Sequence, residues 1–576
     1  MDNFDFNKIL YVKPSLTVSQ RKIHNVIGID TETTVRGKCF MLCTSLGDVF
    51  TIDDVPRCFF SRKYRNANFV VWNLRFDSGS ILQCLPRRKL VELWKTTRTS
   101  HNGFDFLYIP HKMLRISRGK NAVTFWDIKD FYGMSLDDAA KQFLSDKKIE
   151  IETKKFTVKY IQKNFDKIKE YCIHDAVLTK KLADKLFVYI KKFKIEPSNL
   201  YSIASVGFEL FKRKSKMIDV YRFWRNNRDL LYYACQAYRG GKFEITARGT
   251  FDGYEYDINS AYPYEISRLV DISKAQVVRS KKYEKDAMYG FLKVRIFNKE
   301  AVPSPVGIKH KTFTFYPCGV FSAYITKSEY EYFVSKNVQV DILDGYFLYI
   351  DRIEYPYKSV IDFLYEMKEK YRHTDRMIYK LAKLFMNSFY GKMVQLTKSH
   401  RGFYIAGPGW NPIYGAVITA NVRCFVSDIQ HRLGKNCLAV HTDSVLTTVE
   451  LPHDLVGKQL GKFSLEKKGR GLIVYSGIYE IEDKNAMRCF HVDGNFSWRK
   501  YLQEFGKSEK ILLREHRVKT WIEAVAEKNF TDINVFKDIP KWLYLNREQK
   551  RIWLEKTNCE KLLTTLEYSI PHFIYE

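Results

Sequence analysis

Four short apolar runs of the chain each stop at an acidic side chain. They read NVIGIDTE (25–32), NFVVWNLRFD (68–77), YEYDIN (254–259) and LAVHTD (438–443). Runs of this length, bounded by polar turn residues, are typical of buried strands, so an acid that follows one lies at the end of a strand. Taken singly, each run also fits an ordinary surface hairpin or a solvated strand end. Four of them in one chain predict that acids from distant segments meet at sheet edges.

The chain carries a large excess of positive charge, which predicts a polyanionic partner. Its 576 residues include 95 Lys and Arg against 65 Asp and Glu, a formal net charge of +30, and the sequence pI is near 9.4. Nucleic acid is the first candidate and a membrane surface the rival. The sequence has no run of about 18 apolar residues and no signal-peptide pattern. We therefore expect a cytoplasmic protein, in the host cytoplasm if the source is viral, with no membrane partner.

The length of the chain, 576 residues, predicts roughly three to five structural units. Residues 23–180 alternate apolar runs with polar turns, an α/β pattern that ends in an amphipathic helix at about 157–190. The later segments are helical at 195–235, strand-like at 250–350, helical and basic at 356–393, mixed at 413–480, and basic and mostly helical at 500–576. We expect an N-terminal α/β unit followed by a composite α+β domain. The eleven cysteines are scattered, so free thiols are expected.

The first two runs and one helix supply a possible metal site. Asp30 and Glu32 lie two residues apart on a strand, so both point to one face, and Asp77 ends the next run. Tyr171 and Asp175, in YCIHD, are spaced i and i+4 on the amphipathic helix and share a side. Four acids so placed could hold two divalent ions about 3.5–4 Å apart, as in phosphodiester cleavage. Tyr171 could orient the attacking water.

In this order, DTET, NLRFD and YCIHD resemble the three exonuclease motifs of family B DNA polymerases. The resemblance implies an RNase H-like 3′–5′ proofreading domain with Asp30, Glu32, Asp77 and Asp175 as metal ligands. It further implies that Thr33, Asn73 and Phe76 hold the single-stranded 3′ end. A lysine of the family site corresponds to either Lys154 or Lys155, and a Ser/Thr-Leu motif near WDIKDF has no clear counterpart.

The other two runs resemble polymerisation motifs of the same family. YEYDINSAYP is similar to motif A and HTDS to motif C, which implies that Asp257, Ile258 and Asp443 hold two Mg²⁺ ions, with Mn²⁺ as a substitute. The family pattern Y-x-D-T-D-S has His441 here in place of its first Asp, and Ala439 in place of Tyr. Two interpretations of His441 stand side by side: it titrates near neutral pH beside the metal site, or it packs at a hairpin turn.

Residues for the nucleotide follow from the segment RHTDRMIYKLAKLFMNSFYGK, which resembles motif B. Helical spacing places Arg372, Arg376, Lys380, Lys383, Asn387 and Tyr390 on one face. A basic stripe of this kind is usually a solvated helix face, and the NSFYG ending favours one that faces a nucleotide. The resemblance implies that the nucleotide-binding residues are Lys383, Tyr262, Asn387, Tyr390, Arg372 and Ser260, with the Tyr262 ring excluding a ribose 2′-OH.

DNA contacts are implied by two further motifs. YRGG (238–241) resembles the Y-x-G-G motif, and SGIYEI offers only part of the K-x-Y motif, because Gly477 stands where a lysine is expected. Lys467, Lys468 or Arg470 could replace that lysine. The residues that the resemblance assigns to DNA, besides those for the 3′ end, are Tyr238, Arg239, Gly240, Gly241, Ser388, Gly391, Lys392 and Tyr479.

Length and motif forms are similar to those of the compact protein-primed branch of the family. The expected right-hand architecture has an antiparallel palm, helical fingers and a small thumb. Its predicted boundaries are 1–195 for the exonuclease domain, 196–269 for the first palm part, 270–355 for an insertion like terminal-protein region 1, 356–393 for the fingers, 394–412 for a shortened second insertion, 413–480 for the second palm part and 481–576 for the thumb and C-terminal region. The second insertion has room for a short hairpin carried by Phe403, Pro408 and Trp410.

These resemblances imply a monomeric DNA-directed DNA polymerase with 3′–5′ proofreading. The expected partners are DNA template-primer, dNTPs and a terminal protein that primes replication of a linear viral or plasmid genome. One alternative is a family B polymerase that uses an ordinary primer or none. Another is a degenerate polymerase that serves as a DNA-binding platform or as an exonuclease only, an interpretation favoured by His441 and Gly477.

Overall fold

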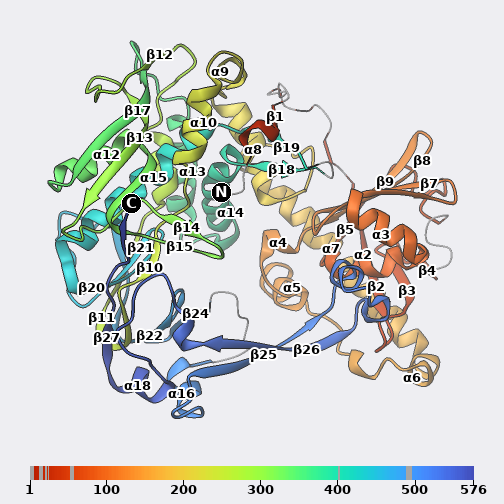
Figure 1. Ribbon diagram of the computed structural model, residues 1–576. Helices are drawn as coiled ribbons and strands as arrows, with labels where there is room; N and C mark the ends of the chain where they lie inside the picture. Colours follow the sequence, from red (N-terminus) through yellow and green to blue (C-terminus); the bar gives the residue numbers. More distant parts are fainter. Residues whose placement is uncertain are drawn as a thin grey trace.

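The N-terminal unit is built on an eight-stranded sheet with the order β4-β3-β2-β5-β9-β8-β7-β6 (Figure 1). The computed structural model describes residues 5–11, 17, 19, 22–23, 25–51, 58–399, 402–487 and 496–576. The strands are β2 (Ile27–Thr33), β3 (Cys39–Thr44), β4 (Val49–Phe50), β5 (Asn68–Val71), β6 (Arg98–His101), β7 (Phe104–Ile109), β8 (Met113–Arg118) and β9 (Asn121–Asp127). The helices are α2 (Leu74–Ile81), α3 (Arg87–Thr96), α4 (Lys129–Tyr132), α5 (Leu136–Leu144), α6 (Val158–Lys163) and α7 (Phe165–Lys191).

Helix α7 lies directly on strand β2. The predicted helix at about 157–190 is present but divided, since α6 ends at Lys163 and Asn164, with φ of −120°, separates it from α7. Gly28 makes the contact with β2 possible, because a Cβ at this position would collide with the Ala176 carbonyl of α7. This close approach sets Asp175 of α7 against the end of β2.

A second, central sheet carries the other acid-bearing strands. Its order is β10-β20-β21-β11-β22-β23-β24, with β27 also paired to β11. The strands are β10 (Phe243–Ile245), β11 (Ala247–Ile258), β20 (Cys437–His441), β21 (Ser444–Thr447), β22 (Phe463–Tyr475), β23 (Ile478–Ile481), β24 (Lys484–Met487) and β27 (Leu566–Tyr568). Helices α11 (Ala261–Ser267) and α15 (Pro412–Leu433) pack together, and residues of both lie in one apolar core with the sheet.

A bundle of helices stands between the central sheet and the N-terminal unit. It comprises α8 (Ile203–Lys214), α9 (Tyr221–Asn226), α10 (Arg228–Ala237), α13 (Lys358–Tyr371) and α14 (Arg376–Met393), which confirms the helical character predicted for 195–235 and 356–393. Asp375 caps α14 by accepting hydrogen bonds from the Met377 and Ile378 amides. Phe389 of α14 stacks on Phe211 of α8 with ring centroids 3.6 Å apart, so α14 is held firmly from one side.

The region predicted as an insertion forms its own five-stranded sheet, ordered β12-β17-β13-β16-β28. It contains β12 (Gln276–Arg279), β13 (Tyr289–Asn298), β16 (Cys318–Thr326) and β17 (Gln339–Tyr349), with helix α12 (Lys327–Ser335) and a separate hairpin, β14 (Ile308–His310) and β15 (Phe313–Phe315). The fifth strand, β28 (Phe573–Tyr575), comes from the far C-terminal segment and pairs parallel with β16.

The shortened second insertion is a small hairpin, as predicted. Strand β18 (Leu396–Lys398) pairs with β19 (Tyr404–Ala406), which also pairs with β1 (Ile9–Leu10); residues 400 and 401 lie outside the described chain. Trp410 is buried against Tyr11 at a ring distance of 5.7 Å, whereas Phe403 is 39% exposed. Trp410 therefore anchors the hairpin base in the core.

The prediction of a mostly helical segment at 500–576 is wrong. Two long antiparallel strands, β25 (Lys510–Val518) and β26 (Phe536–Tyr544), form a ribbon, and the helices are short: α16 (Trp498–Gln503), α17 (Trp521–Ala526) and α18 (Cys559–Thr564). The physical reason is the period of burial: Ile511 and Leu513 are buried on alternate positions of β25, opposite Leu543 of β26. Frequent basic residues between these positions obscured the strand pattern.

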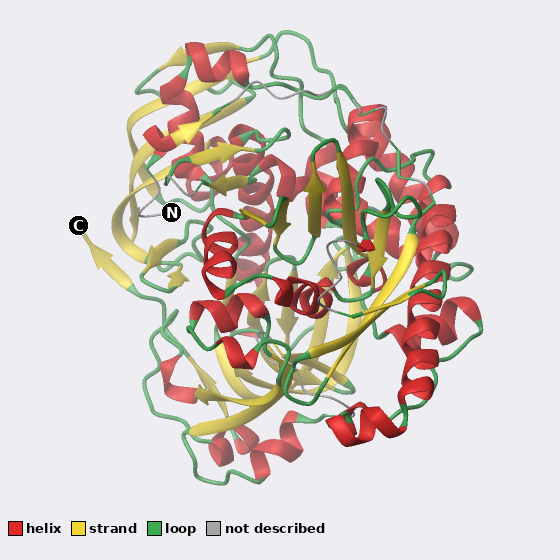
Figure 2. Ribbon diagram, turned by 90° about the vertical axis from the view of Figure 1, so that its right-hand side faces the viewer, coloured by secondary structure: helices red, strands yellow, loops and turns green. Residues whose placement is uncertain are grey.

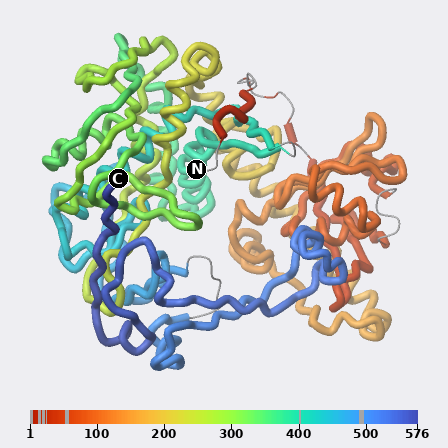
Figure 3. The backbone as a smooth tube through the Cα atoms, in the orientation of Figure 1, coloured from red at the N-terminus to blue at the C-terminus, as the bar shows by residue number. Residues whose placement is uncertain are grey.

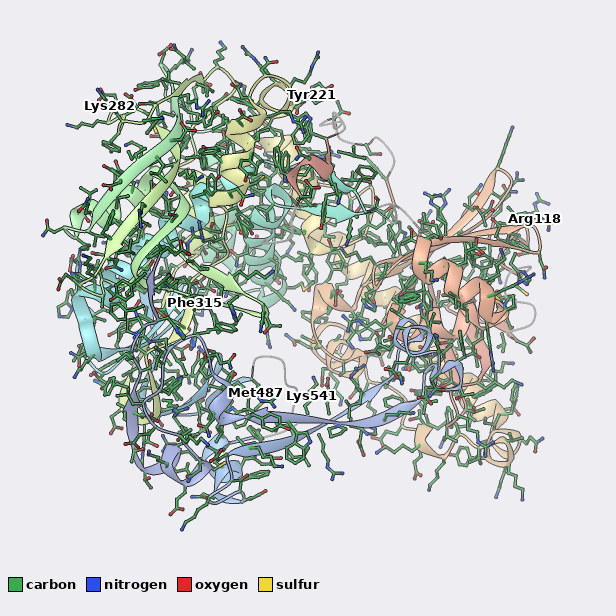
Figure 4. The ribbon with its side chains drawn as sticks, in the orientation of Figure 1. Arg118, Tyr221, Lys282, Phe315, Met487 and Lys541 are labelled. Carbon is green, nitrogen blue, oxygen red and sulfur yellow. The ribbon has the colours of Figure 1, made fainter. Side chains whose placement is uncertain are left out.

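The ribbon joins the two halves of the molecule. In Figures 1 and 3 it runs from the base of the central sheet to the N-terminal unit, and Figure 2 shows the same strands from the side. Its tip, residues 519–535 with α17, packs into the N-terminal core, where Trp521 contacts Tyr108. Phe315 of β15, Met487 of β24 and Lys541 of β26 lie on the inner side of this arrangement (Figure 4). Among the described residues, no helix is long and apolar enough to span a membrane.

Candidate active sites

The first acidic cluster lies where β2, α2 and α7 meet. Asp30 and Glu32 stand on β2, Asp77 on α2, and Tyr171 and Asp175 on α7, so the structure brings together all the acids that the first motifs predicted. Oxygens of Asp30 and Glu32 and the Cys172 sulfur lie within 4.8 Å of one another.

Because these carboxyl groups are shielded from water and lie close together, their charged forms are unfavourable without a cation. Desolvation, followed by the repulsion of Asp175, raises the pKa of Asp30 to about 7. Desolvation likewise raises the pKa values of Glu32, Asp77 and Asp175. Within the described residues, the buried Oδ1 of Asp175 has no hydrogen-bond partner. Several buried carboxylates with an unused oxygen fit a hard divalent cation such as Mg²⁺.

A lysine that the motifs did not identify completes the cluster. Lys148 forms an ion pair with Asp175, and its Nζ donates to the Tyr171 hydroxyl at 2.9 Å. Burial alone would lower the pKa of Lys148, but Asp175 and Asp30 hold it above its usual value. Lys154 and Lys155 lie on an exposed turn outside the cluster. No local pattern singles out Lys148, because its proximity arises only from tertiary folding.

The residues predicted to hold a 3′ end lie beside the cluster and are partly exposed. Thr33 ends β2, Asn73 stands at the N-cap position of α2 without a capping hydrogen bond, and Phe76 lies one residue before Asp77. Their placement keeps them available to a ligand that approaches the acids.

The second acidic cluster forms where β11 and β21 pair in the central sheet. Asp257 is the register partner of Ser444, and the Ile258 amide donates to the Asp443 carbonyl at 2.8 Å. Thr442, with φ of 69°, makes the tight turn that precedes Asp443. Asp257 and Asp443 are thus brought to the same end of adjacent strands.

Lys383 of α14 opposes the rise in the pKa values of both Asp257 and Asp443. Burial, followed by Asp443 and Glu466, raises the pKa of Asp257 to about 7, against the opposing effect of Lys383 and Lys484. Burial also raises the pKa of Asp443, and Lys383 again opposes the shift. Glu466, on the neighbouring strand β22, is a third acid that the motifs did not predict.

His441 packs between two aromatic rings. Its ring centroid lies 4.8 Å from that of Phe243 and 5.0 Å from that of Tyr479, the latter nearly parallel at 15°. Tyr479 donates to Glu255 at 2.5 Å, and Lys484 donates to the same Oε1 at 2.6 Å. This packing agrees with the hairpin-turn interpretation of His441.

The cation nearest to this network is not among those the sequence suggested. Lys467 forms an ion pair with Asp483, and Lys468 one with Glu450 at 3.4 Å. Lys484, on β24, is instead the lysine that joins Glu255 and influences the pKa of Asp257. The sequence did not single out Lys484, because it lies beyond Tyr479 on the next strand of a hairpin and not before it, where the motif places its lysine.

Three tyrosines line the space between α11 and α14. The Tyr262 and Tyr390 ring centroids are 4.7 Å apart, and the Tyr390 and Tyr238 hydroxyls are hydrogen-bonded at 2.6 Å. Ser260, with φ of 53°, receives a hydrogen bond from Lys368 of α13 at 3.4 Å. Lys368 is buried, and desolvation lowers its pKa; it is a basic residue close to motif A that the sequence did not predict.

The single basic face predicted for 372–390 is divided in the structure. Lys383 and Asn387 are exposed on α14, but Arg372 caps α13 and pairs with Glu369 at 2.8 Å. The prediction that Arg372 continues the stripe of α14 is therefore wrong, because the chain turns at Thr374 before α14 begins. The Lys380 side chain is also taken up by another contact, because its Nζ donates a hydrogen bond to the Tyr132 carbonyl of the N-terminal unit.

The remaining motif B residues, Ser388, Gly391 and Lys392, differ in exposure and in hydrogen bonding. Ser388 donates to the Phe385 carbonyl of its own helix at 3.1 Å, whereas Gly391 is exposed. Desolvation lowers the pKa of Lys392 to about 8, and its Nζ donates to Gln395 at 3.1 Å.

A buried arginine, Arg423, holds the YRGG loop by hydrogen bonds to its carbonyl groups. Arg423 of α15 donates to the Arg239 and Gly240 carbonyls, each at 2.8 Å, and pairs with Glu329 at 2.7 Å. The Arg239 guanidinium donates to carbonyls of the loop and insertion, including Gly307 at 2.7 Å. Gly241 allows Thr442 to approach, because a Cβ there would collide with the Thr442 side chain. The loop is therefore positioned against the turn that carries Asp443.

A cavity of about 870 Å³ opens beside this loop. Its wall includes the loop itself, the β14–β15 hairpin and part of the C-terminal segment, and its basic side chains are Arg239, Lys309, Arg547 and Lys550. The wall thus combines residues of three separate regions of the chain.

Comparison with known proteins shows what the whole chain is similar to. A family model for organellar and viral type B DNA polymerases matches residues 144–406. The fold is similar to that of Phi29 DNA polymerase complexed with primer-template DNA and incoming nucleotides: the TM-score is 0.63 at 16% identity, over 91% of this chain and 100% of that chain. The chain is similar to family B DNA polymerases. The expected multidomain architecture, with a palm, fingers and thumb, is confirmed by this fold.

Other proteins match a smaller share of this chain. A DNA polymerase of Acidianus bottle-shaped virus is 25% identical over 275 residues, 44% of this chain and 40% of that protein. A probable DNA polymerase of Podospora anserina is 20% identical over 454 residues, 61% of this chain and 37% of that protein. Phi29 DNA polymerase complexed with single-stranded DNA matches with a TM-score of 0.56 at 18% identity, over 82% and 90% of the two chains. The chain thus spans about 40% of the length of these two curated relatives.

Proposed function

We propose that this chain is a DNA-directed DNA polymerase with its own 3′–5′ exonuclease. The observation that carries the polymerase proposal is the convergence of Asp257 and Asp443 at one end of the central sheet, with Lys383 of α14 facing both. The net charge of +30 suits a DNA partner. The separate cluster of Asp30, Glu32, Asp77 and Asp175 supports the exonuclease.

At the polymerising site, Asp257 and Asp443 would hold two divalent cations, with Ile258 beside them. Such ions lower the pKa of an attacking hydroxyl and stabilise negative charge on a departing pyrophosphate. Lys383 and Asn387 are exposed and would contact the triphosphate, and Tyr262 with Tyr390 would form the wall against which the sugar and base pack. Lys368 adds a second cation near Ser260.

At the exonuclease site, Asp30, Glu32, Asp77 and Asp175 would hold the cations that activate water and stabilise the leaving oxygen. Tyr171 and Lys148, joined at 2.9 Å, would orient the attacking water. Thr33, Asn73 and Phe76 would contact the 3′ end.

A gel assay of primer extension tests the polymerase proposal. Wild-type protein with template-primer, dNTPs and either Mg²⁺ or Mn²⁺ should extend a labelled primer, and binding should weaken steeply with salt because counterions are released. If neither ion supports incorporation, the degenerate-polymerase alternative is correct.

We further propose that synthesis on the linear genome starts from a terminal protein. The insertion sheet between motifs A and B, and the fold likeness to Phi29 DNA polymerase, support this proposal. Incubation with a candidate terminal protein, template ends and a labelled dNTP should transfer the label covalently to that protein. Equal initiation without the protein would favour an ordinary primer or none.

Replacing Tyr262 with valine should relax sugar selection. The Tyr262 ring is braced by Tyr390 at 4.7 Å, and removing it opens space for a 2′-OH. We expect the ratio of ribonucleotide to deoxyribonucleotide incorporation, measured by single-nucleotide kcat/KM, to rise at least about tenfold. Tyr264→Val, two residues along the same helix, is the matched control. An unchanged ratio in Tyr262→Val would mean that the ring is a core residue only.

The raised pKa values predict how pH affects the cation-free protein. Asp30 and Asp257 have pKa values raised to about 7, so between about pH 4 and 7 the folded state holds protons that the unfolded chain has released. Their contribution to stability is present below the unfolded pKa and is lost as the pH rises through 7. The melting temperature should therefore fall over this range, and Mg²⁺ should restore more of it at about pH 8 than at about pH 5.

Calorimetry with and without EDTA measures this dependence. The variant Asp30→Ala, Glu32→Ala should show a shallower fall than the wild type, because fewer buried acids titrate. An equal slope would show that the raised pKa values do not govern the dependence.

A further inference from the structure

The tip of the thumb ribbon is part of the N-terminal core. Trp521 is 1% exposed and its ring lies 5.1 Å from that of Tyr108 on β7. Val525 and Ile533 are buried in the same cluster. The tip is therefore docked on the unit that contains the first acidic cluster, on the side of helix α2.

Asn534 continues this contact as a chain of hydrogen bonds that ends on Asp77. Thr31 Oγ1 donates to Asp77 Oδ1 at 2.9 Å, and the Thr31 and Ser80 hydroxyls are 3.0 Å apart. Thr31 is the donor in both contacts, so its single hydroxyl hydrogen is shared between Asp77 and Ser80. The Ser80 oxygen also accepts from Asn534 Nδ2 at 3.0 Å.

The second hydrogen of the Asn534 amide is also used. It is donated to the Phe76 carbonyl at 3.0 Å, which fixes the nitrogen on this side because a carbonyl can only accept. Phe76 and Ser80 both belong to α2, the helix that carries Asp77. Asn534 thus holds the helix at two points.

The backbone at Asn534 is shaped for this contact. Its φ is 60°, a left-handed conformation that asparagine adopts more readily than most residues, and it is 2% exposed. Its amide N–H donates to the Lys519 carbonyl at 2.9 Å, which closes the loop of the tip. On the other side, Gly79 permits the approach, since a Cβ there would collide with the Asn534 side chain.

We propose that Asn534 is a positioning residue of the exonuclease site, supplied by the thumb. It orients Asp77 through Ser80 and Thr31, so the editing site is complete only while the ribbon tip is docked. This inference rests on the proposed exonuclease function. Partners that orient metal-binding groups from behind typically contribute about 10–100-fold to activity or metal affinity.

Two substitutions separate the hydrogen bonds from the packing. Asn534→Gly removes the side chain and tolerates the positive φ. Asn534→Asp keeps the shape but cannot donate to the Phe76 carbonyl. Asn337→Gly is the matched control, because Asn337 also has a positive φ, 58°, and lies in the insertion.

The measurements are single-turnover degradation of single-stranded DNA, primer extension by the same preparation, and hydrogen exchange of α2 amides in cation-free protein. Both Asn534 variants should lower the maximal degradation rate about 10–100-fold with the half-saturating DNA concentration within about twofold, since Asn534 is buried. Extension should be unchanged, and residues 74–81 should exchange faster than in the Asn337→Gly control.

Three results would overturn the inference. Unchanged degradation in both variants would show that Asp77 does not need Asn534. Equal loss of degradation and extension, with a lower melting temperature, would show a role in folding only. Unchanged exchange of residues 74–81 in the Asn534 variants would show that Asn534 does not support α2. If the wild type itself degrades nothing, the exonuclease proposal fails, and the exchange of the same samples still tests the support of α2 by Asn534.

Discussion

Asp443→Ala should reduce primer extension by at least about 10³-fold while leaving degradation of single-stranded DNA within about threefold. The loss follows from the position of Asp443 at the end of β21, next to Asp257, where the two carboxylates would share cations. The exonuclease cluster lies on a different sheet and should be unaffected. Pre-steady-state incorporation of one dNTP, with Mg²⁺ and with Mn²⁺, measures the effect.

Asp252→Ala is the matched control for this experiment. Asp252 lies on the same strand as Asp257 but is exposed and opposite Arg470. Its variant should extend primers like the wild type. If Asp443→Ala also does so, Asp443 is not a ligand and the polymerase proposal loses its main support.

The double variant Asp30→Ala, Glu32→Ala should lower 3′ degradation by at least about 10³-fold and leave extension within about threefold. Glu32 is buried and Asp30 is half-buried near Asp175, and their removal takes away half of the four carboxylates that would hold the cations. Degradation of a 5′-labelled single strand and extension of a paired primer, in one preparation, give the two rates.

The double variant Glu92→Ala, Asp105→Ala controls for lost negative charge on the N-terminal unit. Both residues are exposed and lie at the far edge of the sheet, near β6. If the Asp30 and Glu32 variant loses extension together with degradation, these acids support the fold and the division into two sites is wrong.

The sequence predicted those parts of the sites that short-range patterns determine. Apolar runs define strands, strands end at acids, and the period of two places Asp30 and Glu32 on one face. The same rules put Asp257 and Asp443 at strand ends, and the resemblance to motifs A and C paired them; the central sheet brings them together. Their roles as ligands stay predictions.

Residues brought in by tertiary folding could not be predicted in this way. Lys148, Lys484 and Asn534 reach their partners through turns or distant segments whose path no local pattern records. Arg372 illustrates the opposite error. Its spacing fits the helical period of the stripe, but the helix is interrupted before Asp375, so Arg372 lies at the end of α13 and not on α14.

The ribbon is rooted in two different hydrophobic cores. Its base, with Leu513 and Leu543, packs with α16 and α18, whereas its tip contributes Trp521 and Ile533 to the N-terminal unit. A fragment cut at residue 195 would therefore lose side chains that fill its own interior and would expose apolar surface to water. The two acidic clusters lie on different sheets, but the units that carry them share a core, so any chimera that exchanges the N-terminal unit must carry residues 519–535 with it.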